Sequence, residues 1–179
     1  GLFHLFRFLT RSKVRILCYH GGSIGDEHEF NSLLFCRPAL LEARLCWLRD
    51  KGFSIVPLDA AVDMLRRPGA RPRLPAVLTF DDGWFSTYAR LHPVIAQHQV
   101  PATLYLCTGY CVGERPNLDV ALNYVLWKSG LGRVSIRGVD AALDGDHDFS
   151  TAAGRQRFAD AARGWLSSIK GRDAVNAAL

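Results

Sequence analysis

The sequence lacks a long apolar run. No stretch approaches the roughly 18 consecutive apolar residues that a membrane span requires, so we expect no transmembrane span. It also lacks long low-complexity tracts and internal repeats of fixed period, which argues against a disordered chain and a solenoid. Nearly half of the 179 residues are apolar, and a chain of this length can bury a real core. These absences predict a globular domain.

Paired cysteines are lacking as well. The five cysteines are an odd number and form no C-x-x-C pair, and no second pair with metal-ligand spacing accompanies Cys107 and Cys111. Cys18, Cys46 and Cys107 lie in apolar runs, so we predict that they are small buried hydrophobic residues. This usage favours a reducing, cytoplasmic compartment. The cell envelope or the extracellular space is the alternative.

Dense basic clusters are nearly absent. The formal net charge is +5, from 22 basic and 17 acidic residues, and one cluster stands out at residues 66–73. No aromatic residues interleave with it for base stacking, which favours a solvated loop and argues against a nucleic-acid partner.

Residues 1–13 are apolar with scattered arginines and lack a small-residue cleavage site. We expect a plain first helix or strand there, although the absence of a starting methionine leaves the question of a signal peptide open.

Alternating strands and helices are predicted for residues 14–113. Predicted strands end at Tyr19, Pro57, Phe80 and Cys107, and they are almost continuously apolar, as is typical of strands covered on both faces. The intervening helices are predicted to follow Pro38, Asp59 and Phe85. This order predicts an α/β fold with parallel strands, either a barrel or an open sheet.

Residues 114–179 depart from this alternation. Helices are predicted at 118–128 and 150–170, a short strand at 133–137 and a polar turn at 142–150. Because four strands do not close a barrel of seven or eight, we expect this part to be a mostly helical insertion in a domain that continues beyond the chain.

Two adjacent carboxylates, Asp81 and Asp82, follow the strand at 76–80, and His20 follows the first strand. Function concentrates at the carboxyl ends of parallel strands, so these side chains are expected at one edge of the sheet. A divalent cation is a common way to keep neighbouring carboxylates ionised; one would bind the ion and the other accept a proton from water. The alternative, equally weighted on spacing alone, is that an aspartate caps the following helix.

The stretch Thr79–Gly83, T-F-D-D-G, and the later V-P-A-T at 100–103 resemble the polysaccharide deacetylase family, also called carbohydrate esterase family 4 or the NodB-type domain. The I-L-C-Y-H stretch at 16–20 is similar to the opening of one subgroup. The resemblance extends over about residues 14–113. It implies a partial, distorted (β/α) barrel and a hydrolase that removes N-acetyl groups from an N-acetylated polysaccharide or oligosaccharide.

The resemblance also implies roles for individual residues. Asp81 corresponds to the catalytic base and Asp82 to a ligand of a divalent metal, often zinc in this family. His20, at the Y-H strand end, is a candidate for lining the substrate cleft or orienting Asp81. Trp84 could stack on a sugar, although packing against the next helix is slightly favoured.

The family's remaining motifs are missing. None of the six histidines forms H-x-x-x-H, and His92–Pro93 imitates only the ending of that motif, so we interpret His92 as structural. With Asp82 and no histidine pair, we expect the chain alone to be inactive and to bind zinc weakly or not at all.

Two other functions remain open on the sequence. One is a non-catalytic carbohydrate-binding or scaffold protein derived from the same fold. The other is a different metal-dependent amidase, or a phosphate-handling α/β protein, that uses the same carboxylate pair. Continuation of the gene past Leu179 into H-x-x-x-H-P would favour the deacetylase.

Overall fold

The computed structural model describes residues 2–67, 69, 72–112 and 117–168, and the backbone alone for residues 2–4 and 6. It divides into two compact units, residues 1–108 and 109–179. The domain boundaries expected at 13/14 and 113/114 stay predictions, and the expected insertion includes residues 114–116 and 169–179, which lie outside the described residues. No helix in the described ranges is both long and apolar enough to cross a membrane.

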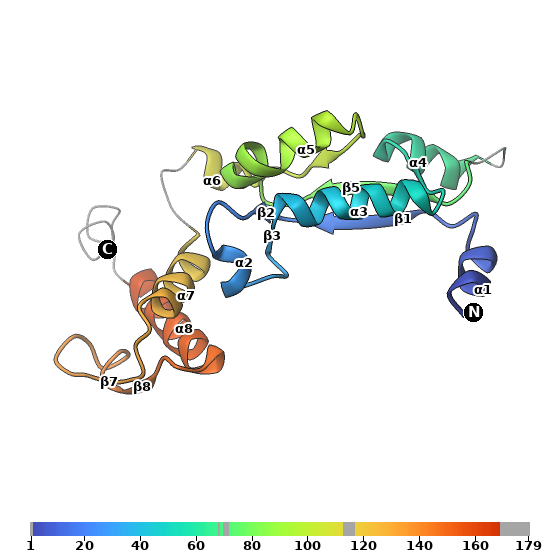
Figure 1. The fold of residues 1–179 in the computed structure, drawn as a ribbon. Coiled ribbons are helices and arrows are strands. Elements are labelled where there is room, and N and C mark those ends of the chain that lie inside the picture. The colour runs from blue at the N-terminus through green and yellow to red at the C-terminus, as the bar shows by residue number, and fades with distance from the viewer. Residues whose placement is uncertain (1, 68, 70–71, 113–116, 169–179) are drawn as a thin grey trace. The chain divides into compact units, whose positions relative to one another are not determined.

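The first unit is an α/β arrangement (Figure 1). Its elements in chain order are α1 (Leu2–Leu9), β1 (Arg15–Tyr19), β2 (Gly21–Gly22), α2 (Glu27–Phe30), β3 (Phe35–Cys36), α3 (Pro38–Asp50), β4 (Ser54–Ile55), α4 (Leu58–Arg66), β5 (Pro75–Phe80), the π-helix η1 (Thr87–Leu91), α5 (His92–Gln97) and β6 (Thr103–Leu104). The strands and helices predicted from the sequence are present, with β4 and β6 shorter than expected.

The main sheet is parallel, as predicted. β1 pairs with β5 over its whole length, while the other edge of β5 pairs with β4 at its start and with β6 at its end. The four described strands form an open sheet, so barrel closure does not follow from these residues.

The core of this unit lies on one face of the sheet, where α3 runs along the β1–β5 pair (Figure 1). Every residue of β5 is buried, but the residues of β1 alternate in burial. The expectation that both faces of each strand are covered is therefore wrong for β1 among the described residues. Leu17 packs against the core, whereas the side chain of Ile16 is exposed because successive side chains of a strand point to opposite faces.

The helix predicted at 85–98 is interrupted. Residues 87–91 form a π-helix before α5 begins. Pro93 has no backbone N–H to donate to the preceding turn, and the Thr87 hydroxyl donates a hydrogen bond to the backbone carbonyl of His20 at 2.7 Å. The proline accompanies the wider turn of the π-helix, and the Thr87 hydrogen bond connects that turn to the end of β1.

The second unit contains α7 (Leu118–Lys128), β7 (Arg133–Ile136), β8 (Gly145–Asp148) and α8 (Ala152–Ser168), and α6 (Thr108–Val112) spans the division between the units. The polar turn predicted at 142–150 is wrong in part, because β8 pairs with β7 in an antiparallel hairpin. Asp146 on β8 accepts hydrogen bonds from Ser135 and Arg137, so cross-strand polar contacts compensate for its low strand propensity.

Candidate active site

The parallel pairing of β1 with β5 brings the predicted polar residues to one edge of the sheet. Tyr19 and Phe80 are register partners, and the backbone N–H of Asp81 donates to the carbonyl of Tyr19 at 2.8 Å. His20 and Asp81 therefore leave neighbouring strand ends side by side. The prediction that they meet at the carboxyl edge is confirmed.

The turn after β5 has a constrained backbone. Asp82 and Gly83 have φ angles of +71° and +74°, a region that costs most residues about 1–2 kcal/mol and glycine almost nothing. A Cβ on residue 83 would also meet the side chain of Leu106, which would have to move. The positive φ is therefore the main reason for glycine at this position.

The carboxylate of Asp82 is held by Trp84, whose indole N–H donates to Oδ2 at 3.0 Å. The Trp84 ring lies edge-on to Phe35 of β3, with centroids 5.5 Å apart. The sequence slightly favoured packing of Trp84 against the next helix, but in the structure Trp84 packs against β3. The interaction orients Asp82, and within the described part of the chain its carboxylate accepts no hydrogen bond from the following helix.

Cys18 joins His20 and Asp81 in a cluster, and this position of Cys18 was not predicted from the sequence. One donor atom from each of these three residues lies within 4.8 Å of the others, and the Cys18 thiol donates to Oδ2 of Asp81 at 3.2 Å. The sequence contains information from which this position of Cys18 could have been predicted, because residues 18 and 20 of a strand end share a face. Cys18 was instead predicted to be buried because its sequence neighbours are apolar.

The prediction that Cys18, Cys46 and Cys107 are buried is wrong. Cys18 and Cys107 are exposed and Cys46 is half-buried. Cys18 lies on the face of β1 opposite Leu17, and Cys107 lies beyond the end of β6. Slight burial, the hydrogen bond to Asp81 and the negative charges of Asp81 and Asp82 together raise the pKa of the Cys18 thiol.

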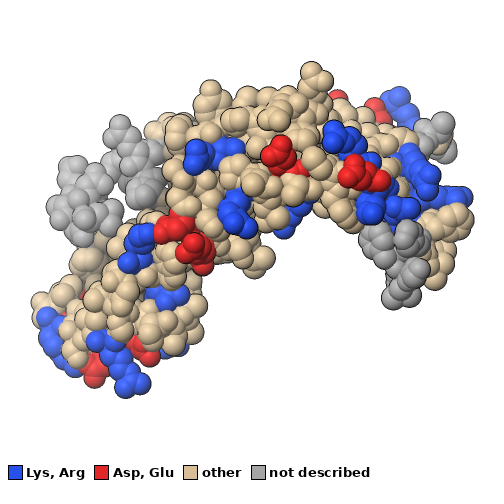
Figure 2. All heavy atoms as spheres, viewed as in Figure 1, with Lys and Arg blue, Asp and Glu red and all other residues tan. Residues whose placement is uncertain are grey.

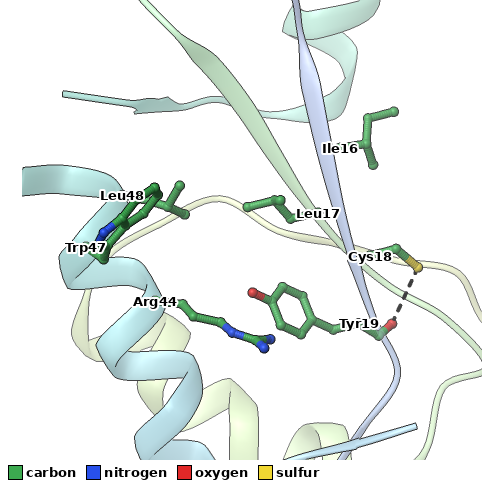
Figure 3. A pocket seen from close by; sticks show the side chains of 7 residues that line it. All are labelled: Ile16, Leu17, Cys18, Tyr19, Arg44, Trp47 and Leu48. Atoms are coloured by element: carbon green, nitrogen blue, oxygen red, sulfur yellow. Dashed lines mark hydrogen bonds between the residues drawn. The ribbon is translucent and has the colours of Figure 1, made fainter. Parts of the chain in front are cut away.

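A cavity of about 340 Å³ lies between β1 and α3 (Figure 3). In the view, Leu17 and Tyr19 point toward α3 while Ile16 and Cys18 point away from it. Burial raises the pKa of the Tyr19 hydroxyl, and nearby Arg44 partly offsets this. Asp81 and Asp82 do not line this cavity, but Cys18, which donates to Asp81, does.

The other histidines whose side chains are described lie outside the Cys18–His20–Asp81 cluster. His92 is exposed and stacks on Tyr88, with centroids 5.6 Å apart, in agreement with a structural role. His98 lies 3.5 Å from Glu42. Asp82 is also outside the cluster, so the described residues do not assemble the aspartate-and-two-histidine set that the family resemblance implies.

Charged side chains of both signs lie on the surface of the described residues. Figure 2 shows acidic side chains lying among the basic ones on the face in view.

Comparison with known proteins finds similarity to one family over part of the chain. Residues 69–142 match the model of the polysaccharide deacetylase family, and this range includes the T-F-D-D-G turn described above. The chain is therefore similar to polysaccharide deacetylases over this range. The resemblance seen in the sequence is thereby confirmed.

Two polysaccharide deacetylase relatives are 31% identical to the chain. YxkH of Bacillus subtilis (strain 168), a protein named as a polysaccharide deacetylase, matches over 108 residues, which are 60% of this chain and 36% of YxkH. The poly-β-1,6-N-acetyl-D-glucosamine N-deacetylase of Escherichia coli (strain K12) matches over 80 residues, 45% of this chain and 12% of that protein. The chain thus spans about a third or less of these relatives.

A solved structure supports the α/β fold of this chain. The structure of IcaB from Ammonifex degensii superposes with a TM-score of 0.50 at 21% identity, covering 86% of this chain and 66% of that one.

Proposed function

We propose that this chain is part of a metal-dependent hydrolase that removes N-acetyl groups from an N-acetylated polysaccharide or oligosaccharide. The observation that carries the proposal is the T-F-D-D-G turn, which lies inside the matched range and sets Asp81 beside His20 at the carboxyl edge of a parallel sheet, with Asp82 next in the chain. The name of the E. coli relative supports an N-acetylglucosamine polymer as the substrate class.

Asp81 is the proposed base. Its backbone is fixed by the hydrogen bond to Tyr19, and its half-buried carboxylate can accept the proton of a water molecule that attacks the acetamide carbonyl. His20 is the proposed residue that orients Asp81 or lines the cleft, because a ring nitrogen of His20 lies close to that carboxylate. Trp84 holds Asp82 through its indole N–H.

Asp82 is the proposed ligand of a divalent cation, zinc in the first instance. A bound cation would lower the pKa of water and polarise the carbonyl. One carboxylate is a small part of such a site, so the remaining ligands would come from elsewhere in the complete protein. We propose on the same ground that the open sheet is part of a distorted (β/α) barrel and that these 179 residues alone are inactive.

The test measures acetate release from N-acetylglucosamine oligomers by the complete product of the gene that encodes these residues. Asp81→Asn should lower the rate about 10²- to 10⁴-fold, the usual contribution of a general base. Asp63→Asn, on the exposed face of α4, is the control and should leave the rate unchanged. Oligomer binding without acetate release would instead support the carbohydrate-binding or scaffold alternative.

A further inference from the structure

The Cys18–His20–Asp81 cluster combines one sulfur, one nitrogen and one oxygen donor at the end of two paired strands. The paired strands determine where each donor residue lies. Cys18 is on β1, His20 directly follows β1, and Asp81 directly follows β5, whose last residue is the register partner of Tyr19. Cys18 points away from the core-forming helix (Figure 3). The cluster thus lies at the carboxyl edge of the sheet, where the exposed thiol of Cys18 gives an ion access to it.

We propose that this cluster binds one borderline-soft divalent cation such as zinc, at a position separate from Asp82. Zinc binds cysteine, histidine and carboxylate donors at about 2.0–2.3 Å, which places the donors of a tetrahedral ion roughly 3.3–3.6 Å apart. The sulfur-to-oxygen distance of 3.2 Å is close to this spacing, and the other two donor pairs lie within 4.8 Å. Binding would therefore draw the donors closer together, and three protein ligands leave the fourth position open.

The polar groups of the cluster are incompletely satisfied without an ion. Nδ1 of His20 is buried and has no hydrogen-bond partner among the described residues, a situation that normally costs about 1–3 kcal/mol. The thiol of Cys18 donates its hydrogen bond to a carboxylate that has a second carboxylate next to it in the chain. A cation would compensate the carboxylate charge and bind the thiol as thiolate, and the thiol proton would pass to the solvent.

This ligand set differs from the one that the family resemblance implies, because it uses Asp81 and omits Asp82, whose Oδ2 accepts from Trp84. The sequence analysis expected weak zinc binding because it counted Asp82 as a ligand and left out Cys18 and His20. The proposed ligand set replaces that expectation. One consequence rests on the proposed function: an ion at this position would occupy the carboxylate that serves as the base. Binding itself does not depend on that function.

The test uses the reduced, metal-free 179-residue chain and does not measure activity. Cobalt(II) is added as a spectroscopic probe, and zinc binding is measured by calorimetry. We expect one equivalent of each metal and a thiolate-to-cobalt charge-transfer band in the near ultraviolet. Cys18→Ser should abolish the band and weaken zinc binding at least about 100-fold, since even outer-shell partners contribute about 10- to 100-fold.

Two control variants make the outcome specific. Cys107→Ser removes another exposed thiol and should leave the band intact, and Asp82→Asn should also retain it. Absence of the band in the unsubstituted chain, or its persistence in Cys18→Ser, would overturn the proposal. Loss of zinc binding in Asp82→Asn alone would also overturn it and would favour the ligand role that the proposed function gives to Asp82. Circular dichroism establishes that each variant is folded.

Discussion

Asp82 combines an unfavourable backbone conformation with a specific side-chain contact. Its positive φ is tolerated because aspartate is among the few residues that enter the left-handed region. The indole of Trp84 then holds its carboxylate, and Phe35 packs against the indole ring. Trp84 is therefore a positioning residue for Asp82.

Trp84→Phe removes the indole donor and keeps an aromatic ring against Phe35. We expect the free energy of unfolding to fall by about 1 kcal/mol, the net value of one such hydrogen bond, as measured by urea denaturation. A double-mutant cycle with Asp82→Ala should assign most of that loss to the pair. If the two substitutions prove additive, the hydrogen bond does not stabilise the turn.

The loop that leads into α2 depends on one carboxylate. Oε2 of Glu27 accepts hydrogen bonds from the backbone N–H groups of Gly25 and Ile24 at 2.8 and 3.0 Å, and from the Ser23 hydroxyl at 3.2 Å. Burial would raise the pKa of Glu27, but these hydrogen bonds outweigh it and the net pKa is lowered. Arg90 donates to the Ser23 and Ile24 carbonyls, so η1 stabilises the same loop.

This lowered pKa predicts the sign of a pH effect. A carboxylate with a folded-state pKa below its unfolded value stabilises the fold above the unfolded pKa, and loses that contribution as the pH falls through the folded pKa. Glu27→Gln should therefore reduce the free energy of unfolding at pH 7 by about 1 kcal/mol, because glutamine keeps a neutral acceptor and hydrogen bonds to a charged group contribute about 1.5–3 kcal/mol against about 1 kcal/mol for neutral ones. The difference from the unsubstituted protein should shrink in acid below the folded pKa.

Glu29→Gln is the matched control, since Glu29 is an exposed carboxylate on the same helix. Denaturation at several pH values should show little change for it. An equal loss in both variants at pH 7 would show that helix charge, and not the loop hydrogen bonds, is responsible.

The chain as a whole consists of two compact units with separate cores. In the second unit, the buried Phe149 packs edge-on against Phe158 of α8, with centroids 5.1 Å apart, and stacks with His147 of β8 at 5.8 Å. Arg163 of α8 pairs with Asp119 of α7 at 2.7 Å. Aromatic packing and this ion pair connect the hairpin and the two helices.

Phe149→Ala should destabilise the second unit by about 3–5 kcal/mol, the usual cost of deleting a buried aromatic side chain. Amide hydrogen exchange should accelerate across α7, β7, β8 and α8. Exchange in β1 and β5, which belong to the first unit, should stay as slow as before. Equal acceleration in both units would show that they unfold as one cooperative body.

The sequence by itself determined the alternation of strands and helices, the parallel α/β class and the T-F-D-D-G turn at a strand end, because apolar periodicity and glycine placement are local properties. The His20–Asp81 neighbourhood also followed from it, since parallel strands share one carboxyl edge. Only the tertiary structure decided that Cys18 is exposed beside Asp81, that Trp84 holds Asp82 and that residues 145–148 form a strand. Each of these depends on which face of a strand is covered and on partners distant in sequence, and local composition does not encode either.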